Sequence, residues 1–554
     1  MVREVMFNNP HDGSIVFIVA EMIKDHLHHK RIKEALDVLD VKMIEQDRVK
    51  PENYIYNLLI DGCAKVGYSA KAFNLFTKMR QRGLKVTGAT YTSLFNACAT
   101  TPYPQDGLNK ANRLRQIMIE KSFEPNATNY NAMIKAFGRC NDVKTAFLLV
   151  DEMTEKKLAI SVETFNFLLQ ACASDKEFGF RHALLVWHKM YQRRMKPDIY
   201  SFNLLLRCVR DTELGDVETM EEVLRTILLK SESIDEQIKL EAHSTTPTDN
   251  PAVQLVKSTK PEEVDDPKPN LLARRPHLGN LISLSEVKKP EDRLLLLGGF
   301  LGFLNTMKQL EVKPDLKTYT ELIEVIPSSK AAENRLMSQL WKDEIKCDVD
   351  FFNILMKKRS MRFDYEGARE VFAMIDKVKL KPDIVSYGVL ALGCQTLEQA
   401  RELLQEMNEV GIKLNIQIVG AMLKTGCVTK NFNYVIDMLN LMSEWKIKPS
   451  ERMLETLTIF IKTCNREKKK DNQKLPKNFR DDYNTFKMKF ENWKSRNGLK
   501  DLELDEAKKL LKEAPWEQFQ SVQADGYEDR KGTQKEKLKK LKRYVGKVRP
   551  KDVE

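Results

Sequence analysis

Residues 127–166 read ATNYNAMIKAFGRCNDVKTAFLLVDEMTEKKLAISVETFN. Apolar residues recur at helical spacing in two runs, which are separated by the polar turn RCND. The stretch opens with Tyr130-Asn131, and a second opening of the same kind, Phe165-Asn166, follows 35 residues later. This pattern predicts a helix, a turn and a second helix. Because two short helices cannot bury their apolar faces alone, we expect copies of the unit to stack on one another.

Openings of this kind recur along most of the chain. Each is an aromatic residue followed by a small polar residue or glycine. They stand at Tyr56-Asn57, Tyr91-Thr92, Tyr130-Asn131, Phe165-Asn166, Phe202-Asn203, Tyr319-Thr320, Phe352-Asn353 and Tyr387-Gly388, and a weaker one stands at Val419-Gly420. Several units close on proline and a polar residue, which ends one helix and begins the next turn. The chain is therefore predicted to be an array of helix–turn–helix repeats.

The second run of many units places a small and a large apolar residue on one helical face. In each case an alanine precedes a methionine by seven residues, which is about two helical turns. The pairs are Ala72/Met79, Ala111/Met118, Ala146/Met153, Ala183/Met190 and Ala400/Met407. An alanine permits close approach of a neighbouring helix, so these faces are expected to lie in the core of the array.

The charge distribution, the cysteine spacing and the lack of long apolar runs limit the kinds of protein that this chain can be. The chain has 554 residues and a net charge of +12, with 27 Lys+Arg against 17 Asp+Glu in residues 462–554, so the rest is nearly neutral. No CxxC pair or zinc-type His/Cys spacing occurs, and Cys63, Cys98, Cys172 and Cys394 recur at one place in the repeats. Buried thiols in a reducing compartment explain this better than disulfides do. No apolar run approaches a membrane span, and no targeting peptide is evident.

The domain organisation follows from changes in composition along the chain. We expect a loose N-terminus at 1–13, repeats at 14–230 and 293–462, a Pro-rich disordered insertion at 231–292, a helical extension at 463–520 and a basic disordered tail at 521–554. Within the insertion, residues 271–292 are candidates for docking on the array. Residues 199–315 are read as one repeat with a large insertion, and the alternative is two repeats.

The openings, the proline endings and the 35-residue period together resemble the pentatricopeptide repeat family. The resemblance covers about residues 14–462. It implies an all-α, right-handed α-solenoid of helix–turn–helix repeats that binds single-stranded RNA, one base per repeat. It further implies a mitochondrial matrix protein without catalytic activity or cofactors. The expected partners are tRNA precursors of the leucine type during 3′-end processing, with large-subunit rRNA, tRNA-processing enzymes and mitochondrial ribosomal proteins as further candidates.

The resemblance assigns base readout to the residue after each opening aromatic and to the last residue of the repeat. The pairs are Asn57/Thr87, Thr92/Asn126, Asn131/Ser161, Asn166/Asp198, Asn203/Asp315, Thr320/Asp348, Asn353/Asp383, Gly388/Asn415 and Gly420/Ser450. The family's code reads the first seven as pyrimidine-A-C-U-U-G-U. The alternative is that the closing residues only cap helices. The family's aliphatic wedge, three residues before the reading position, is replaced by a charged residue in several units, which predicts partial readout.

Other candidate contacts carry alternatives of their own. Lys65 and Arg139, at matching places after the first helix, are weak candidates for phosphate contacts or are solvated charges at helix ends. The aromatic stripe Phe479, Tyr483, Phe486, Phe490 and Trp493 marks one helix face, which is either buried or stacks on RNA bases. No catalytic motif is visible. A protein-binding helical scaffold is the competing hypothesis for the whole array.

Overall fold

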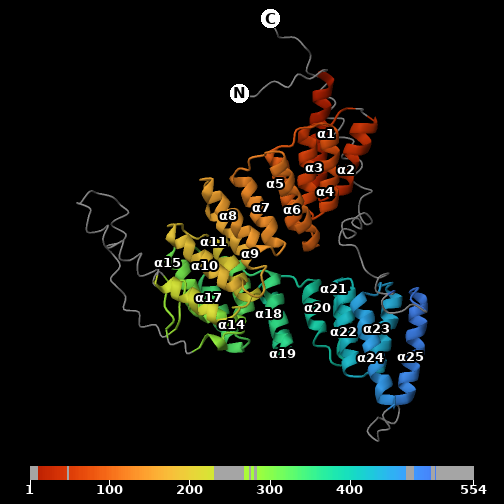
Figure 1. The fold of residues 1–554 in the computed structure, drawn as a ribbon. Coiled ribbons are helices and arrows are strands. Elements are labelled where there is room, and N and C mark those ends of the chain that lie inside the picture. Colours follow the sequence, from red (N-terminus) through yellow and green to blue (C-terminus); the bar gives the residue numbers. More distant parts are fainter. Residues whose placement is uncertain are drawn as a thin grey trace. The chain divides into compact units, whose positions relative to one another are not determined.

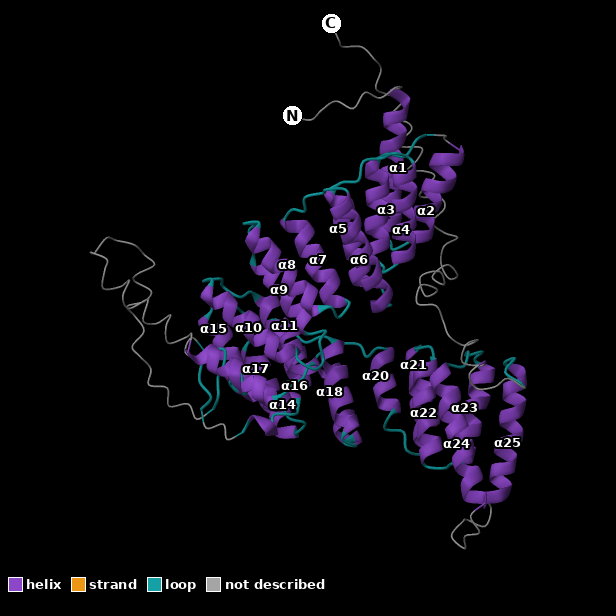
Figure 2. Ribbon diagram, viewed as in Figure 1, coloured by secondary structure: helices purple, strands orange, loops and turns teal. Residues whose placement is uncertain are grey.

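The computed structural model describes residues 10–46, 49–229, 268–273, 276–279, 283–469, 479–500 and 506. In this part of the chain all the regular elements are helical, apart from isolated bridges that Asn270 makes with His277 and Leu297 (Figure 2). The described residues form two compact units, one ending at Cys140 and the other beginning at Asn141. The prediction of an all-α array of helix–turn–helix repeats is confirmed.

The first unit consists of successive helical hairpins (Figure 1). Its helices are α1 (Pro10–His28), α2 (Ile32–Asp37), a π-helical continuation at Val38–Gln46, α3 (Asn53–Lys65), α4 (Ser69–Gln81), α5 (Gly88–Thr100), α6 (Pro104–Glu120) and α7 (Ala127–Arg139). The first helices α3, α5 and α7 pack side by side, and each second helix packs against the first helices on either side of it. Helices α1 and α2 form the first hairpin of the repeats expected from residue 14 onwards.

The second unit continues the same alternation. Its named α-helices are α8 (Val143–Glu155), α9 (Val162–Cys172), α10 (Gly179–Gln192), α11 (Ile199–Asp211), α14 (Pro290–Leu295), α15 (Gly299–Gln309), α16 (Leu316–Val325), α17 (Lys330–Lys342), α18 (Val349–Met361), α19 (Tyr365–Lys377), α20 (Ile384–Ala391), α21 (Leu397–Val410), α22 (Ile416–Val428), α23 (Phe432–Glu444), α24 (Glu451–Lys469) and α25 (Phe479–Arg496). A 3₁₀ turn at Leu284–Glu286 and a helix at 217–229 complete them. Here the layer of first helices is α9, α11, α16, α18, α20, α22 and α24.

The core of each unit lies between its two helix layers. Every opening aromatic is buried on a first helix, and all five Ala/Met pairs of the second helices are buried as well. The four repeated cysteines are buried free thiols, and burial raises the pKa of Cys63 to about 12. A neutral thiol packs as a small apolar side chain, so these cysteines serve the core, as their spacing predicted.

The large insertion falls between two first helices that are neighbours in space. Helix α11 packs directly against α16, and Phe202 on α11 meets Phe303 on α15 with ring centroids 5.4 Å apart. Both α15 and the helix at 217–229 follow α11 in the chain, so the choice between one repeat with an insertion and two repeats in 199–315 stays a prediction. Part of the range assigned to a disordered insertion is packed: Leu271, Leu272 and Leu284 are buried, and the Leu271 N–H donates to the Leu296 carbonyl. Residues 230–267 lie outside the described residues.

The aromatic stripe of the tail is buried. All five residues lie on one face of α25, which packs on α23, where Phe432 meets Phe479, Tyr483 and Phe486 at 5.3–6.0 Å between ring centroids. Of the two alternatives, base stacking is therefore wrong and burial is correct. Helix α24 runs through 462, so the array continues into the predicted extension without a break. The helix expected near 504–519 lies outside the described residues except Glu506, and the basic tail lies outside them entirely.

Candidate functional site

The closing residue of most repeats caps the first helix of the next repeat. Its side-chain oxygen accepts a hydrogen bond from the backbone N–H three residues later, which satisfies one of the free donors at the start of the helix. The residues that cap in this way are Thr87, Asn126, Asp198, Asp315, Asp348, Asp383, Asn415 and Ser450. The capping role that the sequence offered as an alternative is thus present, whatever else these side chains do.

At the junction of α9 and α11, the capping carboxylate also holds the amide of Asn166. The Asn166 Nδ2 donates to Asp198 Oδ1 and Oδ2 at 3.1 and 3.2 Å. The other end of the amide, Oδ1, accepts from the hydroxyl of Ser201 at 2.7 Å. Ser201 is fully buried and its own backbone N–H donates to Asp198 Oδ1 at 2.8 Å. One amide therefore bridges two neighbouring first helices and has a partner at each end.

Two further junctions repeat this arrangement. Asn203 donates to Asp315 at 3.3 Å and accepts from Thr318 at 2.8 Å. This pair is separated by the large insertion, and the packing of α11 on α16 brings it together. The same contacts recur at the α18–α20 junction, where Asn353 donates to Asp383 at 3.0 Å and accepts from Ser386 at 2.7 Å. The predicted Asn/Asp pairs are thus adjacent in all three cases.

At the junction of α3 and α5 the carboxylate is missing but the hydroxyl is present. Asn57 Oδ1 accepts from Thr90 Oγ1 at 2.7 Å. Thr90 Oγ1 also lies 3.1 Å from the hydroxyl of the closing residue, Thr87. Each of these two hydroxyls can donate or accept. The amide of Asn57 is consequently bound by a neutral and reversible chain of hydrogen bonds.

The two reading threonines differ from one another. Thr92 Oγ1 accepts from Asn129 Nδ2 at 2.9 Å, so its own proton is left to donate elsewhere. Thr320 instead donates its proton to the carbonyl of Leu316 in its own helix, at 2.8 Å. The residue at the equivalent place of α18, three after the closing residue Asp348, is Phe351, which carries no polar side chain. The sequence assigned both threonines to purine repeats, but their hydroxyls present different hydrogen-bonding groups.

Two pairs do not form such a bridge. Gly388 and Gly420 have no side chain to pair with Asn415 and Ser450. Asn131 belongs to the first compact unit and Ser161 to the second, so their relation is not described. The reading positions also differ in access: Asn203 and Asn353 are only 4% exposed, whereas Asn57, Thr92 and Asn166 are partly exposed.

The residues at the wedge position, three before the reading residue, are exposed on the first turn of their helices. Tyr54, Tyr200 and Val385 are 50%, 66% and 51% exposed, which is unusual for such apolar side chains on an otherwise well-packed array. The charged residues Glu163 and Asp350 are exposed at the equivalent place. Apolar surface for inserting between bases is therefore available at some repeats and is replaced by negative charge at others.

The two basic residues predicted as weak candidates for phosphate contacts lie exposed at the ends of their helices. Lys65 ends α3 and pairs with Asp61 at 2.9 Å, with its side chain 76% exposed; Arg139 ends α7 and is exposed as well. An exposed ion pair of this kind contributes little to stability.

At the α18–α20 junction, the bridging carboxylate of Asp383 has a lowered pKa. Partial burial opposes its ionisation, but hydrogen bonds from the Ser386 backbone and the Asn353 amide outweigh this effect and hold the pKa of the carboxyl below its ordinary value.

The bridging hydroxyls were not identified from the sequence. Thr90, Ser201, Thr318 and Ser386 each stand three residues after the closing residue of a repeat. That spacing is a signal for a helix cap, so it gave no reason to connect these residues with the reading position of the preceding repeat. Only the packing of one first helix on the next places the hydroxyl within 2.7–2.8 Å of the amide oxygen.

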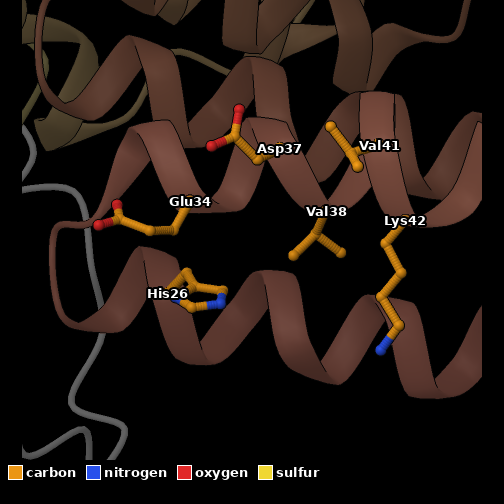
Figure 3. Close-up of a pocket in the computed structure, with 6 residues that line it drawn as sticks. All are labelled: His26, Glu34, Asp37, Val38, Val41 and Lys42. Atoms are coloured by element: carbon orange, nitrogen blue, oxygen red, sulfur yellow. The ribbon is translucent and has the colours of Figure 1, made fainter.

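One depression in the described part of the chain lies apart from the repeat junctions. It lies beside α1 and α2 and is lined by His26, Glu34, Asp37, Val38, Val41 and Lys42 (Figure 3). Its two carboxylates make it unsuitable for phosphate, and Lys42 is directed to Met22. Within the described ranges no cluster of three or more His, Cys, Asp or Glu side chains could hold a metal ion. Among the same residues no helix is long and apolar enough to cross a membrane.

Comparison with known proteins identifies the repeats. A family model described as the pentacotripeptide-repeat region of PRORP matches residues 42–239, and a pentatricopeptide repeat domain model matches 335–394 and 402–465. Pentatricopeptide repeat-containing protein 1, mitochondrial, of Mus musculus is 31% identical over 545 residues, covering 89% of this chain and 76% of the mouse protein. The Homo sapiens protein of that name is 31% identical over 478 residues, covering 77% and 68%. The crystal structure of PPR10 from maize has 16% identity and a TM-score of 0.41, covering 87% of this chain and 64% of that chain.

Proposed function

This chain belongs to the pentatricopeptide repeat family, and on that premise we propose that it binds single-stranded RNA without catalysing a reaction on it. Each repeat faces one base, which is read by the residue after the opening aromatic together with the closing residue. The positions involved are Asn57, Thr92, Asn131, Asn166, Asn203, Thr320 and Asn353 with their closing partners. The predicted register is pyrimidine-A-C-U-U-G-U.

The observation that carries the proposal is the Asn166 bridge. Its amide is held between Asp198 and Ser201 and is partly exposed. One N–H shared between the two oxygens of the Asp198 carboxylate satisfies both contacts of the amide nitrogen, so a second N–H and one oxygen lone pair are left for another partner. An amide with a purely structural role is usually buried with its donors and acceptors paired, which is not the case for Asn166. An edge of a base supplies a matching acceptor and donor, and the exposed Tyr200 on the first turn of α11 offers a surface for stacking.

The cellular setting follows from the family relationship. The mouse and human relatives are named as mitochondrial proteins, and we propose a mitochondrial location for this chain. Within that setting the proposed targets are tRNA precursors of the leucine type during 3′-end processing or turnover, and large-subunit rRNA during its maturation. Crosslinking the protein to RNA in its organelle and sequencing the bound fragments would identify the target. If RNA is recovered with the protein but these RNAs are not enriched in it, this part of the proposal is contradicted.

Base readout is tested at Asn166. A seven-nucleotide RNA in the predicted register is varied at its fourth base, and binding is measured for the native protein and for Asn166→Thr. We expect the preference to move from U towards G, by roughly 1–3 kcal/mol on the groove-readout scale. The variant should remain folded, since the helix propensities of Thr and Asn are similar. A change in stability with no change in base preference would contradict the proposal.

The electrostatic contribution is tested by salt. Affinity for single strands should fall with added salt, with a slope of about −0.7 for each phosphate contact. Removing the residues after Asp529, which include many of the lysines and arginines of the tail, should weaken binding to all sequences alike and reduce the slope. Base preference at the fourth position serves as the control and should not change. An unaltered slope would exclude the tail from phosphate binding.

A protein-binding scaffold is the second candidate, and a surface feature favours it. Met361 and Phe363 at the α18–α19 turn are 70% and 79% exposed. Exposed apolar side chains that lie close together are typical of protein interaction sites. If the scaffold is correct, salt should have little effect on partner binding and RNA affinity should be weak. A third possibility, nuclease activity, would require metal-dependent RNA cleavage by the purified protein.

A further inference from the structure

The proposed code leaves one property of asparagine unexplained, because an amide can present its two ends to a base in either order. The nitrogen donates and the oxygen accepts, and rotation by half a turn exchanges them. Uracil presents an N–H beside a carbonyl oxygen, whereas cytosine presents a ring nitrogen that accepts beside an amino group that donates. The two pyrimidines therefore require opposite orders of donor and acceptor. An amide that rotates freely can pair with both of them.

We propose that the hydroxyl three residues into the following helix is a positioning residue for pyrimidine choice, acting together with the closing carboxylate. The residues are Ser201, Thr318 and Ser386, which serve the amides of Asn166, Asn203 and Asn353. This inference rests on the proposed RNA-binding function. It adds residues that touch no base but determine which base the reading asparagine accepts.

The hydrogen bonds at Asn166 define a single favourable order. The carboxylate of Asp198 can only accept, so it takes the amide nitrogen. The oxygen of the amide must then face Ser201, whose hydroxyl lies 2.7 Å from it and 2.9 Å from Asp198 Oδ1. The shorter of these two contacts is the one to the amide oxygen, and the hydroxyl donates its proton there. In the reverse order the amide oxygen would lie about 3 Å from the carboxylate, where two acceptors repel. The buried position of Ser201 keeps water from replacing its hydroxyl.

The α3–α5 junction shows the same geometry without the charge. Asn57 accepts from Thr90, but its closing partner, Thr87, is a neutral hydroxyl that can donate or accept. If the direction of each hydrogen bond between Asn57, Thr90 and Thr87 is reversed, these groups are still paired with one another. The amide of Asn57 is therefore free to adopt either order, which agrees with the assignment of this repeat to either pyrimidine rather than to U alone.

The test compares hydroxyl removal with hydroxyl retention at Ser201. Binding is measured with the seven-nucleotide RNA carrying U or C at its fourth base. Native protein should prefer U by about tenfold, the equivalent of 1.4 kcal/mol. Ser201→Ala should lower this preference to within about threefold, because one of the two orienting contacts is gone. Ser201→Thr should retain it, since Thr318 shows that threonine is accommodated at this place of a first helix.

Gln399→Ala is the matched control. Gln399 completes a capping box at α21, a second helix, where its Oε1 accepts from the backbone of Thr396 at 3.3 Å. Its loss should have a similar effect on helix stability and none on the choice between U and C. A gain-of-function variant gives an independent readout: Thr87→Asp should create a preference for U at the first base, and adding Thr90→Ala should reduce that preference.

The outcomes separate the two proposals. If neither the native protein nor any of the variants binds single-stranded RNA, the proposed function fails and this inference fails with it. If RNA binds with base preference but Ser201→Ala discriminates U from C as well as native protein does, only the positioning role is overturned. If Gln399→Ala loses discrimination as much as Ser201→Ala does, the effect is one of helix stability and the inference is also overturned.

Discussion

At the α9–α11 junction an amide side chain spans the two first helices, whereas at the α20–α22 junction the equivalent residue is Gly388. The two junctions share two other features: Phe165 and Tyr387 are buried at the opening, and Asp198 and Asn415 both cap the following helix. The helices pack side by side in both places. The amide bridge is therefore not what holds neighbouring repeats together, and the reading position can vary without loss of the fold.

The largest expected effect is a loss of stability at Phe202, compared with that at its neighbour Asn203. The comparison tests whether burial of the aromatic residue, and not the amide bridge, holds the repeats together. Phe202 is fully buried and meets Trp187 and Phe303 at 4.9 and 5.4 Å between ring centroids. Phe202→Ala should cost about 3–5 kcal/mol through lost burial and the cavity left behind. Asn203→Ala, which removes the bridge, should cost only about 1–2 kcal/mol. Amide hydrogen exchange in α11 measures both, and equal costs would show that the bridge is a major part of the junction.

The second effect distinguishes a charged cap from a neutral one. Asp383→Ala at α20 and Asn415→Ala at α22 should each cost about 1 kcal/mol near neutral pH. The pKa of Asp383 is held below its ordinary value of 3.8 in the folded protein. Its contribution is therefore present above that value and is lost as the pH falls through the folded pKa.

The comparison of these two variants across acid pH is the measurement. The stability difference between native protein and Asp383→Ala, read from hydrogen exchange in α20, should shrink as the solution is acidified below about pH 4. The difference for Asn415→Ala should stay constant, because an amide does not titrate in this range. A parallel pH dependence for the two variants would mean that the carboxylate is not stabilised by its hydrogen bonds.

The smallest effect comes from adding an amide where none exists. A side chain at Gly388 would meet Ile418 at 3.8 Å, an ordinary contact, so Gly388→Asn should fit. It should stabilise α20 by a few tenths of a kcal/mol, because glycine is the poorer helix former. No sharp choice between U and C should appear, since Ile418 offers no hydroxyl and Asn415 no charge. A strong preference for one pyrimidine would show that an asparagine alone is sufficient for readout.

Much of this protein was determined by the sequence itself. The spacing of apolar residues predicted the paired helices, because each helix buries a stripe that repeats with the helical period. The openings such as Tyr130-Asn131 were placed on first helices, and the stripe of α25 on one helix face, for the same reason. Only the structure decided that this face of α25 is buried. These features are local: each depends on residues within about one repeat and on the requirement that an apolar face be covered.

The tertiary structure alone decided which hydroxyls meet the reading asparagines. The resemblance paired Asn203 with Asp315, 112 residues later, but only the packing of α11 on α16 brings Thr318 to the same amide. The difference between Thr92 and Thr320 depends on the residue at the equivalent place of the next helix, Asn129 in one case and Phe351 in the other. A hydrogen bond requires its donor and acceptor to lie within about 3 Å, so its partner follows from the packing of one repeat on the next.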